Sequence, residues 1–290
     1  MAICSVVLLY ASPSYANTQP QNRGLYLTPI REYVNVDAGK AQDGTLTIAN
    51  ITDNPAVVTM SVEQFSVVDY TYNYTFMPTK EDWIKLQTTQ VKLNPGKSQT
   101  IPYTIAPPKG ATPGGHYFTL FASTSLVSGA ISSKVRAASV LYVTVDGPLK
   151  KTSEIRKESI PFISFGGDID FMLDVKNTGN THFFIYTSGK LSGWSARPDG
   201  EEVTHVLLPG TTRTTESTIP APLLPGVYTA TYGYKTDDGH TVNHSRPVLY
   251  LPLWFLAAFM GVGWVGLVIR KRQKRFQKKA ATDSSQRLYK

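Results

Sequence analysis

The chain has 290 residues, enough for two domains of about 100 residues each together with targeting segments. Hydrophobic residues make up 41% and charged residues 17%, a globular composition that excludes a disordered chain. All of the formal net charge of +8 lies after Ile269, where nine basic residues accompany one acid. The preceding residues sum to zero, which excludes the basic surface that nucleic-acid binding requires, so we expect no nucleic-acid partner.

Residues 1–16 have the pattern of a signal peptide. An apolar run from Ala2 to Leu9 is followed by Ser14 and Ala16, small residues that suit a signal-peptidase site. No basic residue precedes the apolar run, so we expect either a start further upstream or a weak signal, and a buried first strand is the alternative. The one cysteine, Cys4, lies in this segment, so the mature chain is expected to hold no disulfide and no thiolate metal site.

Residues 247–269 form a second apolar segment, which contains no charged side chain. At about 1.5 Å per residue, a helix of this length crosses a hydrocarbon core of about 30 Å. A basic tail, 270–290, follows at once, and basic residues next to a span stay in the cytoplasm. The sequence predicts a single-pass plasma-membrane protein with extracellular N-terminal domains, whose helix and tail contact membrane lipid.

Between these two ends, apolar and polar residues alternate with a period of two. Leu46 and Ile48 show the pattern in the first half of the chain, and Phe171 and Leu173 show it in the second. Such alternation predicts strands with one face on a core. No convincing helical period precedes the apolar segment, which indicates an all-β exported part.

Turn residues recur in the same order in both halves of the chain. An Asn turn, a Pro-Gly turn, a strand ending in prolines and a second Pro-Gly turn appear first at Asn50, Pro95-Gly96, Pro107-Pro108 and Pro113-Gly114, and again at Asn177, Pro209-Gly210, Pro220–Pro222 and Pro225-Gly226. Because proline and glycine mark strand ends, the repeat predicts two tandem immunoglobulin-like antiparallel β-sandwiches followed by one transmembrane α-helix. We expect the domains at 17–148 and 160–246, separated by a charged segment, 149–159, that is a solvated linker or an edge strand.

The order of these features resembles the WxL-interacting protein family of bacterial cell surfaces. The matching segments are the export signal, Leu25-Tyr-Leu-Thr-Pro29, the Asn50 turn, the Pro95-Gly96 turn and Pro113-Gly-Gly-His-Tyr117, followed by a second β domain, one span and a Lys/Arg-rich tail. The resemblance implies a first domain that associates with peptidoglycan and a second that contacts partner or host surfaces. The family has no catalytic residue set to carry over.

Motifs of catalysis are missing from the sequence. It contains no phosphate loop, dinucleotide fingerprint, zinc-protease motif or nucleophile elbow. His240 and His244, with Asp237 and Asp238, come nearest to a metal cluster, but Asp238-Gly239 predicts a hairpin turn. The two histidines would also stand about 13 Å apart along a strand. We therefore expect neither an enzyme nor a cofactor or metal.

An aromatic alternation marks the candidate recognition patch. Tyr70, Tyr72, Tyr74 and Phe76 would share one face of an extended strand, with Trp83 nearby. Such a face stacks on sugar rings or fills protein interfaces. Because the intervening residues are polar, burial on the core explains the pattern without a ligand, and an exposed patch is the alternative.

Two functions fit these observations. The leading hypothesis is a non-enzymatic, membrane-anchored surface protein that binds or scaffolds a cell-envelope component, either peptidoglycan or a partner surface protein. The alternative is a membrane-bound, chaperone-like module that acts on exported proteins by strand addition. Strand addition requires a long, open sheet edge, whereas edges blocked by proline, charge or bulges favour the first hypothesis.

Overall fold

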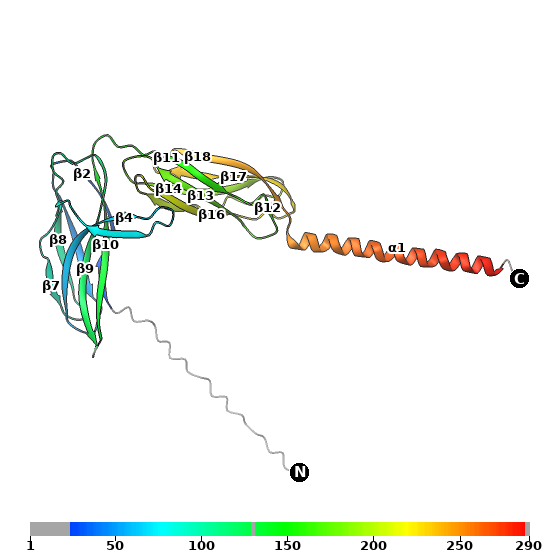
Figure 1. Cartoon of the computed structure of the whole chain (residues 1–290), viewed down its shortest axis with the longest axis horizontal. Helices are drawn as coiled ribbons and strands as arrows, with labels where there is room; N and C mark the ends of the chain where they lie inside the picture. Colours follow the sequence, from blue (N-terminus) through cyan, green and yellow to red (C-terminus); the bar gives the residue numbers. More distant parts are fainter. Residues whose placement is uncertain (1–23, 129–130, 288–290) are drawn as a thin grey trace, which may run out of the picture.

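The computed structural model describes residues 24–128 and 131–287. Two β-sandwiches set at an angle form an elbow, and a long helix extends from the second sandwich (Figure 1). The all-β class with one C-terminal apolar helix is as predicted. The predicted signal peptide, 1–16, lies outside the described residues.

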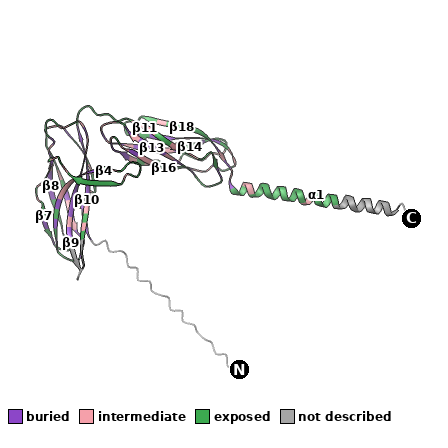
Figure 2. Ribbon diagram, in the orientation of Figure 1, coloured by how far each residue is buried: buried purple, intermediate pink, exposed green. Residues whose placement is uncertain are grey.

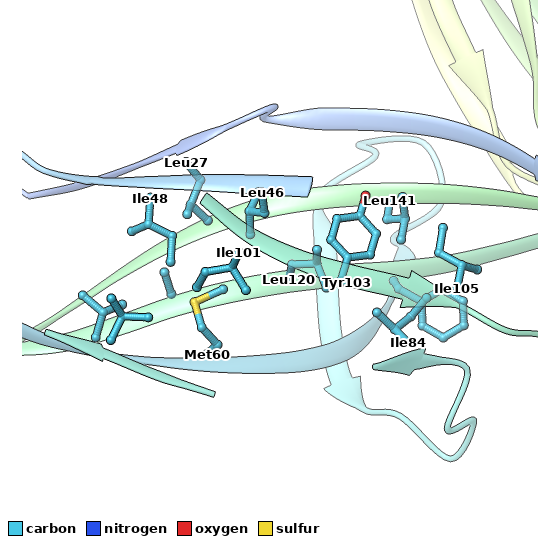
Figure 3. Close-up of a cluster of buried hydrophobic side chains, with 14 of the residues drawn as sticks. Leu27, Leu46, Ile48, Met60, Ile84, Ile101, Tyr103, Ile105, Leu120 and Leu141 are labelled. Carbon is cyan, nitrogen blue, oxygen red and sulfur yellow. The ribbon is translucent and has the colours of Figure 1, made fainter. Parts of the chain in front are cut away.

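The first domain packs two sheets face to face. One sheet has the order β1-β3-β8-β6, formed by Leu25–Thr28, Gln42–Asn50, Ser98–Ile105 and Ile84–Leu86. The other has the order β2-β10-β9-β4-β5, formed by Arg31–Val36, Ile131–Val145, Gly114–Ser128, Ala56–Val67 and Tyr74–Pro78, with β7 (Gln90–Leu93) also paired to β4. Alternating residues such as Leu46, Ile48, Ile101 and Leu120 fill the space between the sheets, as Figure 3 shows.

The second domain repeats this architecture. One sheet has the order β11-β13-β16, formed by Ser153–Ser159, Ile169–Asn177 and Thr212–Ile219. The other has the order β12-β18-β17-β14-β15, formed by Ile163–Ser164, Thr241–Tyr250, Gly226–Thr236, Phe183–Ser192 and Val203–Leu207. Buried Phe171, Leu173, Tyr232 and Tyr234 belong to its core.

Each domain contains one parallel strand pair, so one of its two sheets is mixed and the other is purely antiparallel. In the first domain β2 runs parallel to β10, and in the second β12 runs parallel to β18. The cause is the same in both domains, because the first strand, β1 or β11, belongs to one sheet and the chain then crosses to the other. The shared crossing extends the repeat that the turn residues predicted.

The two turns that recur in the sequence meet in space in each domain. Asn50 is fully buried, and its amide donates to the carbonyl oxygens of Asn54 (2.8 Å) and Leu93 (3.0 Å). Its own carbonyl accepts the N–H of Gly96, the glycine of the Pro-Gly turn, at 2.8 Å. Gly96 has a φ of 66°, a conformation that glycine adopts without strain.

Asn177 makes the corresponding contacts in the second domain. Its amide donates to Thr181 and Leu207, and its carbonyl accepts the N–H of Gly210 at 3.0 Å. Each asparagine therefore fastens a strand end to a Pro-Gly turn, which explains why the two motifs occur together.

The boundaries of the second domain differ from those expected. The charged segment 149–159 contains β11, which pairs with β13, so residues 153–159 are an edge strand and not a solvated linker. The last strand, β18, continues to Tyr250 because Val248 and Tyr250 are buried against the core. The apolar helix therefore begins at Leu253 and not at Pro247.

Helix α1 runs from Leu253 to Arg287 and includes most of the predicted basic tail. Its segment Leu253–Lys274, with a mean hydropathy of 1.8, is long and apolar enough to cross a membrane. None of the most apolar part of this segment is buried against the sandwiches, and Figure 2 shows that the helix is largely exposed. An apolar helix without a protein partner in the described chain favours a lipid environment.

Candidate binding site at the elbow between the domains

The five aromatic residues of the predicted patch do not form one surface. Tyr70 and Tyr72 lie in the β4–β5 turn with φ values of 67° and 58°, so this part of the segment is not extended. Tyr74 and Phe76 lie on the short edge strand β5. Trp83 is buried in the core of the first domain, next to Phe118. The predicted single aromatic face is therefore wrong, because a left-handed turn breaks the alternation.

The β4–β5 turn joins the two domains. The N–H of Tyr70 donates to the carbonyl of Thr212 at 2.7 Å, and the N–H of Thr214 donates to the carbonyl of Tyr70 at 3.2 Å. A carboxylate oxygen of Asp69 accepts the N–H of Thr212 at 2.9 Å. The turn of the first domain thus pairs with the start of β16 in the second, which fixes the angle of the elbow.

Aromatic rings fill the rest of the domain junction. Tyr33 stacks on Tyr142 with ring centroids 4.7 Å apart, and Phe184 of the second domain meets Tyr33 edge-on at 5.3 Å. His182 of the second domain packs against Tyr142 at 5.1 Å and Tyr117 at 5.7 Å. Burial, with a smaller contribution from Lys151, lowers the pKa of His182 to about 4, so its ring is neutral at pH 7.

A cleft of about 290 Å³ opens beside this junction. Its walls come from both domains and consist of Arg31, Tyr72, Tyr74, Phe184, Thr204, His205, Val206 and Arg213. The side chains that line it include two arginines and no carboxylate. Burial, together with the charge of Arg213, lowers the pKa of His205 to about 4, so the histidine adds no charge at pH 7. We call this space the arginine cleft.

Neither arginine of the cleft has an acidic partner among the described residues. Arg31 donates a long hydrogen bond of 3.4 Å to the Tyr74 hydroxyl. Arg213 donates to the carbonyl of Val206 at 3.0 Å, and its guanidinium lies 4.4 Å from the centroid of the Tyr72 ring. The pKa of Arg213 is lowered by burial, and the charge of Arg31 adds to this effect. Two cations that repel each other across a partly buried cleft provide a site for an anionic group, such as a carboxylate.

An aromatic ledge, formed by Tyr74 and Phe76, adjoins the cleft. Their rings stack with centroids 6.1 Å apart, and Phe76 meets Phe121 edge-on at 4.9 Å. Tyr74 is 39% and Phe76 37% exposed, so the ledge is half open to solvent. This part of the predicted recognition patch remains available to a ligand.

The third element of the site is the outer edge of β10. Strand β2 pairs only with Val140–Val145 of β10, while β9 pairs with the whole strand. Within the described chain, Ile131–Ser139 therefore have a strand on one side only. The N–H of Val140 points to this outer side, where it donates to Ile30, so the amides of Ala138, Arg136 and Lys134 point the same way. The open edge ends where β2 begins, at Arg31.

Sequence reasoning missed the two arginines. Arg31 and Arg213 lie in different domains, and no spacing rule brings them together. Their one sequence signal is that each lies in a strand rich in aromatic or β-branched residues, where an isolated cation is uncommon.

No family model and no curated protein matches the sequence. Among solved structures, the chain is similar to a chaperone–tip adhesin complex of CFA/I fimbriae biogenesis, with 10% identity, a TM-score of 0.42 and coverage of 78% of this chain and 98% of the other. The class 5 fimbriae chaperone CfaA is 10% identical, with a TM-score of 0.42 and coverage of 78% of this chain and 99% of the other. The E. coli chaperone DraB is 15% identical, with a TM-score of 0.38 and coverage of 77% of this chain and 97% of the other. These values assign the chain neither a family nor a function.

Proposed function

We propose that the chain is a membrane-anchored protein of the cell envelope that binds an extended segment of another exported protein by strand addition. The observation that carries the proposal is the open edge of β10, a run of outward-facing amides and carbonyls with no partner in the described chain. An extended peptide satisfies such groups by joining the sheet. This is the long edge that distinguishes the strand-addition hypothesis from a simple scaffold.

The arginine cleft specifies one end of the ligand. A strand that adds to β10 in the direction of β2 brings its C-terminal end to Arg31, because β2 is parallel to β10 and starts there. Its terminal carboxylate then enters a cleft with two cations and no acid. Charge-assisted hydrogen bonds to a carboxylate contribute about 1.5–3 kcal/mol.

The test uses the purified full-length chain in detergent and fluorescent 12-residue peptides of alternating Val and Ser. We expect binding by anisotropy, with at least a tenfold loss in Arg31→Ala and an equal loss when the peptide is C-terminally amidated. Ala138→Pro removes an amide from the open edge and should abolish binding, whereas Ala137→Pro, whose amide faces β9, destabilises the fold instead. Unchanged affinity of the well-folded Ala138→Pro variant would contradict strand addition.

A glycan ligand is a second candidate, favoured by the aromatic ledge. Exposed, parallel rings such as those of Tyr74 and Phe76 suit stacking on sugars. We propose peptidoglycan as this glycan, because the sequence resembles the WxL-interacting family. Phe76→Ala should then weaken sedimentation with purified cell wall and leave peptide anisotropy unchanged, and the opposite result would favour the peptide.

The proposed orientation places both sandwiches outside the plasma membrane and the basic end of α1 in the cytoplasm. The position of Arg270–Lys274 directly after the apolar part of the helix supports this topology. Protease added to intact cells should digest the sandwiches and spare a tag placed after Lys290. Protection of the sandwiches would contradict this orientation.

A further inference from the structure

The end of the second sandwich from which α1 leaves is unusually apolar. Strands β14, β16 and β18 finish at this end and β13 and β17 start there, so the connections between them gather around the start of the helix. Six large apolar side chains of these connections and neighbouring strand ends are between 37% and 72% exposed. They form what we call the apolar rim: Phe162, Phe165, Trp194, Leu223, Leu224 and Val227.

The rim is a fixed surface because hydrogen bonds join its loops. The N–H of Leu223 donates to the carbonyl of Ser195 at 3.1 Å, and the N–H of Leu224 donates to the Ser195 hydroxyl at 3.1 Å. The hydroxyl of buried Tyr228 donates to the carbonyl of Leu224 at 2.8 Å. Folding therefore holds these side chains in solvent, at a cost that an additional binding surface would explain.

Backbone hydrogen bonds join the rim to the first turn of the helix. The N–H of Leu251 donates to Ser164 at 2.8 Å, and the N–H of Leu253, the first residue of α1, donates to the carbonyl of Phe165 at 3.1 Å. Only Leu251 and Pro252 separate the last strand from the helix. Figure 1 shows that no spacer lies between sandwich and helix. Wherever α1 enters a bilayer, the rim must lie at the same level.

We propose that the apolar rim inserts into the interfacial layer of the lipid bilayer and docks the second domain on the membrane. The proposal rests on the membrane anchoring of α1. Tryptophan and phenylalanine favour this layer, and the rim continues the apolar surface of the helix at Leu253 and Trp254. The same loops carry one basic residue, Arg197, against four acidic ones, Asp168, Asp199, Glu201 and Glu202, so anionic lipid does not attract them. Insertion therefore depends on apolar burial, and anionic lipid should not strengthen it.

The experiment uses the full-length chain with Cys4 replaced by Ser and one cysteine introduced at a time, labelled with the fluorophore NBD and reconstituted into phosphatidylcholine vesicles. Leu223→Cys reports the rim, and Val262→Cys reports the middle of the helix. His240→Cys reports the opposite end of the same domain, in the β17–β18 turn, and serves as the matched control. Lipids spin-labelled near the headgroup quench a probe in the interfacial layer, and lipids spin-labelled deep in the acyl chain quench a probe at position 262.

We expect quenching and a blue-shifted emission at position 223, and neither at position 240. Quenching at 262 without quenching at 223 would overturn the proposal while leaving the anchoring intact. No quenching at 262 would overturn the anchoring, and this inference with it. Replacing half of the phosphatidylcholine by phosphatidylglycerol should not raise the signal at 223, and a rise of more than twofold would show attraction by charge in place of apolar insertion.

Discussion

The hydroxyl of Tyr72, in the first domain, accepts the backbone N–H of Leu208 in the second at 2.7 Å and lies 2.7 Å from the Thr211 hydroxyl. A phenol from one sandwich therefore satisfies the backbone of the other. Burial raises the pKa of Tyr72, so this contact stays protonated throughout the physiological range. The elbow thus depends on a specific polar contact as well as on ring packing.

Tyr72→Phe should loosen the elbow. The change leaves the Leu208 amide without its acceptor, at a cost of about 1–3 kcal/mol to domain docking. Small-angle scattering should show a larger maximum dimension, and the urea midpoint should fall. Tyr26→Phe, which removes an exposed hydroxyl, is the control and should change neither value. Scattering curves that superimpose would show that the rings alone hold the angle.

Acidification should open the junction through His182. Burial lowers the pKa of this histidine from its ordinary 6.5 to about 4. Between these two values the separated or unfolded form binds a proton that the docked form does not, so stability is full above pH 6.5 and is lost as the pH falls toward 4. Lys151 lowers this pKa further and Asp237 partly opposes it.

The measurement for this prediction is the urea midpoint as a function of pH. We expect a fall from pH 7 to pH 5 in the natural chain and a smaller fall in His182→Gln. His240→Gln is the control, because His240 is exposed in a turn. Identical pH profiles for the natural chain and His182→Gln would assign the effect to other groups, such as His205.

The buried asparagine turns should be the most sensitive polar positions of each core. Asn50→Ala removes the amide that donates to the carbonyls of Asn54 and Leu93, and it removes the acceptor for the N–H of Thr52, which is 3.0 Å away. We expect a loss of about 3 kcal/mol in the free energy of unfolding. Asn54→Ala, in the same loop but exposed, should cost less than about 0.5 kcal/mol. Thermal denaturation of both variants measures the difference.

Trp83 and Phe76 should behave oppositely, although both belong to the predicted aromatic patch. Trp83→Ala creates a cavity in the first core and should cost about 3–5 kcal/mol of stability. At a temperature where it is still folded, that variant should bind its ligand normally. Phe76→Ala should leave the melting temperature within a few degrees and alter binding at the ledge. Equal loss of binding in both variants would contradict this prediction and show that Trp83 contributes to ligand binding.

The strands, the repeat and the apolar helix could be predicted because local patterns determine them. The alternation around Leu46 and Phe171 follows from which side chains face a core. The contact between Asn50 and Gly96 joins two turns, and the Asn and Pro-Gly residues of these turns can be read in the sequence. The predicted start of the span at Pro247 is wrong because Val248 and Tyr250 are as apolar as the helix that follows. Only pairing with β17 identifies them as strand.

The site could not be predicted to the same degree, because it forms between domains. The alternation of Tyr70 to Phe76 is compatible with an extended strand, and only the contact with Thr212 explains the left-handed turn at Tyr70 and Tyr72. Arg31 and Arg213 have no pattern in common and meet only through the elbow. Contacts between distant segments leave no periodic trace in a sequence.

In the proposed membrane-anchored orientation, the two-residue connection between β18 and α1 holds the second sandwich at a fixed distance from the lipid. Its strand β17 has 11 residues and spans about 36 Å at about 3.3 Å per residue, measured from the membrane end to the elbow. A ligand must therefore meet the arginine cleft at roughly that distance from the lipid. Polypeptides still emerging from the membrane come within reach only after about a dozen extended residues have cleared it.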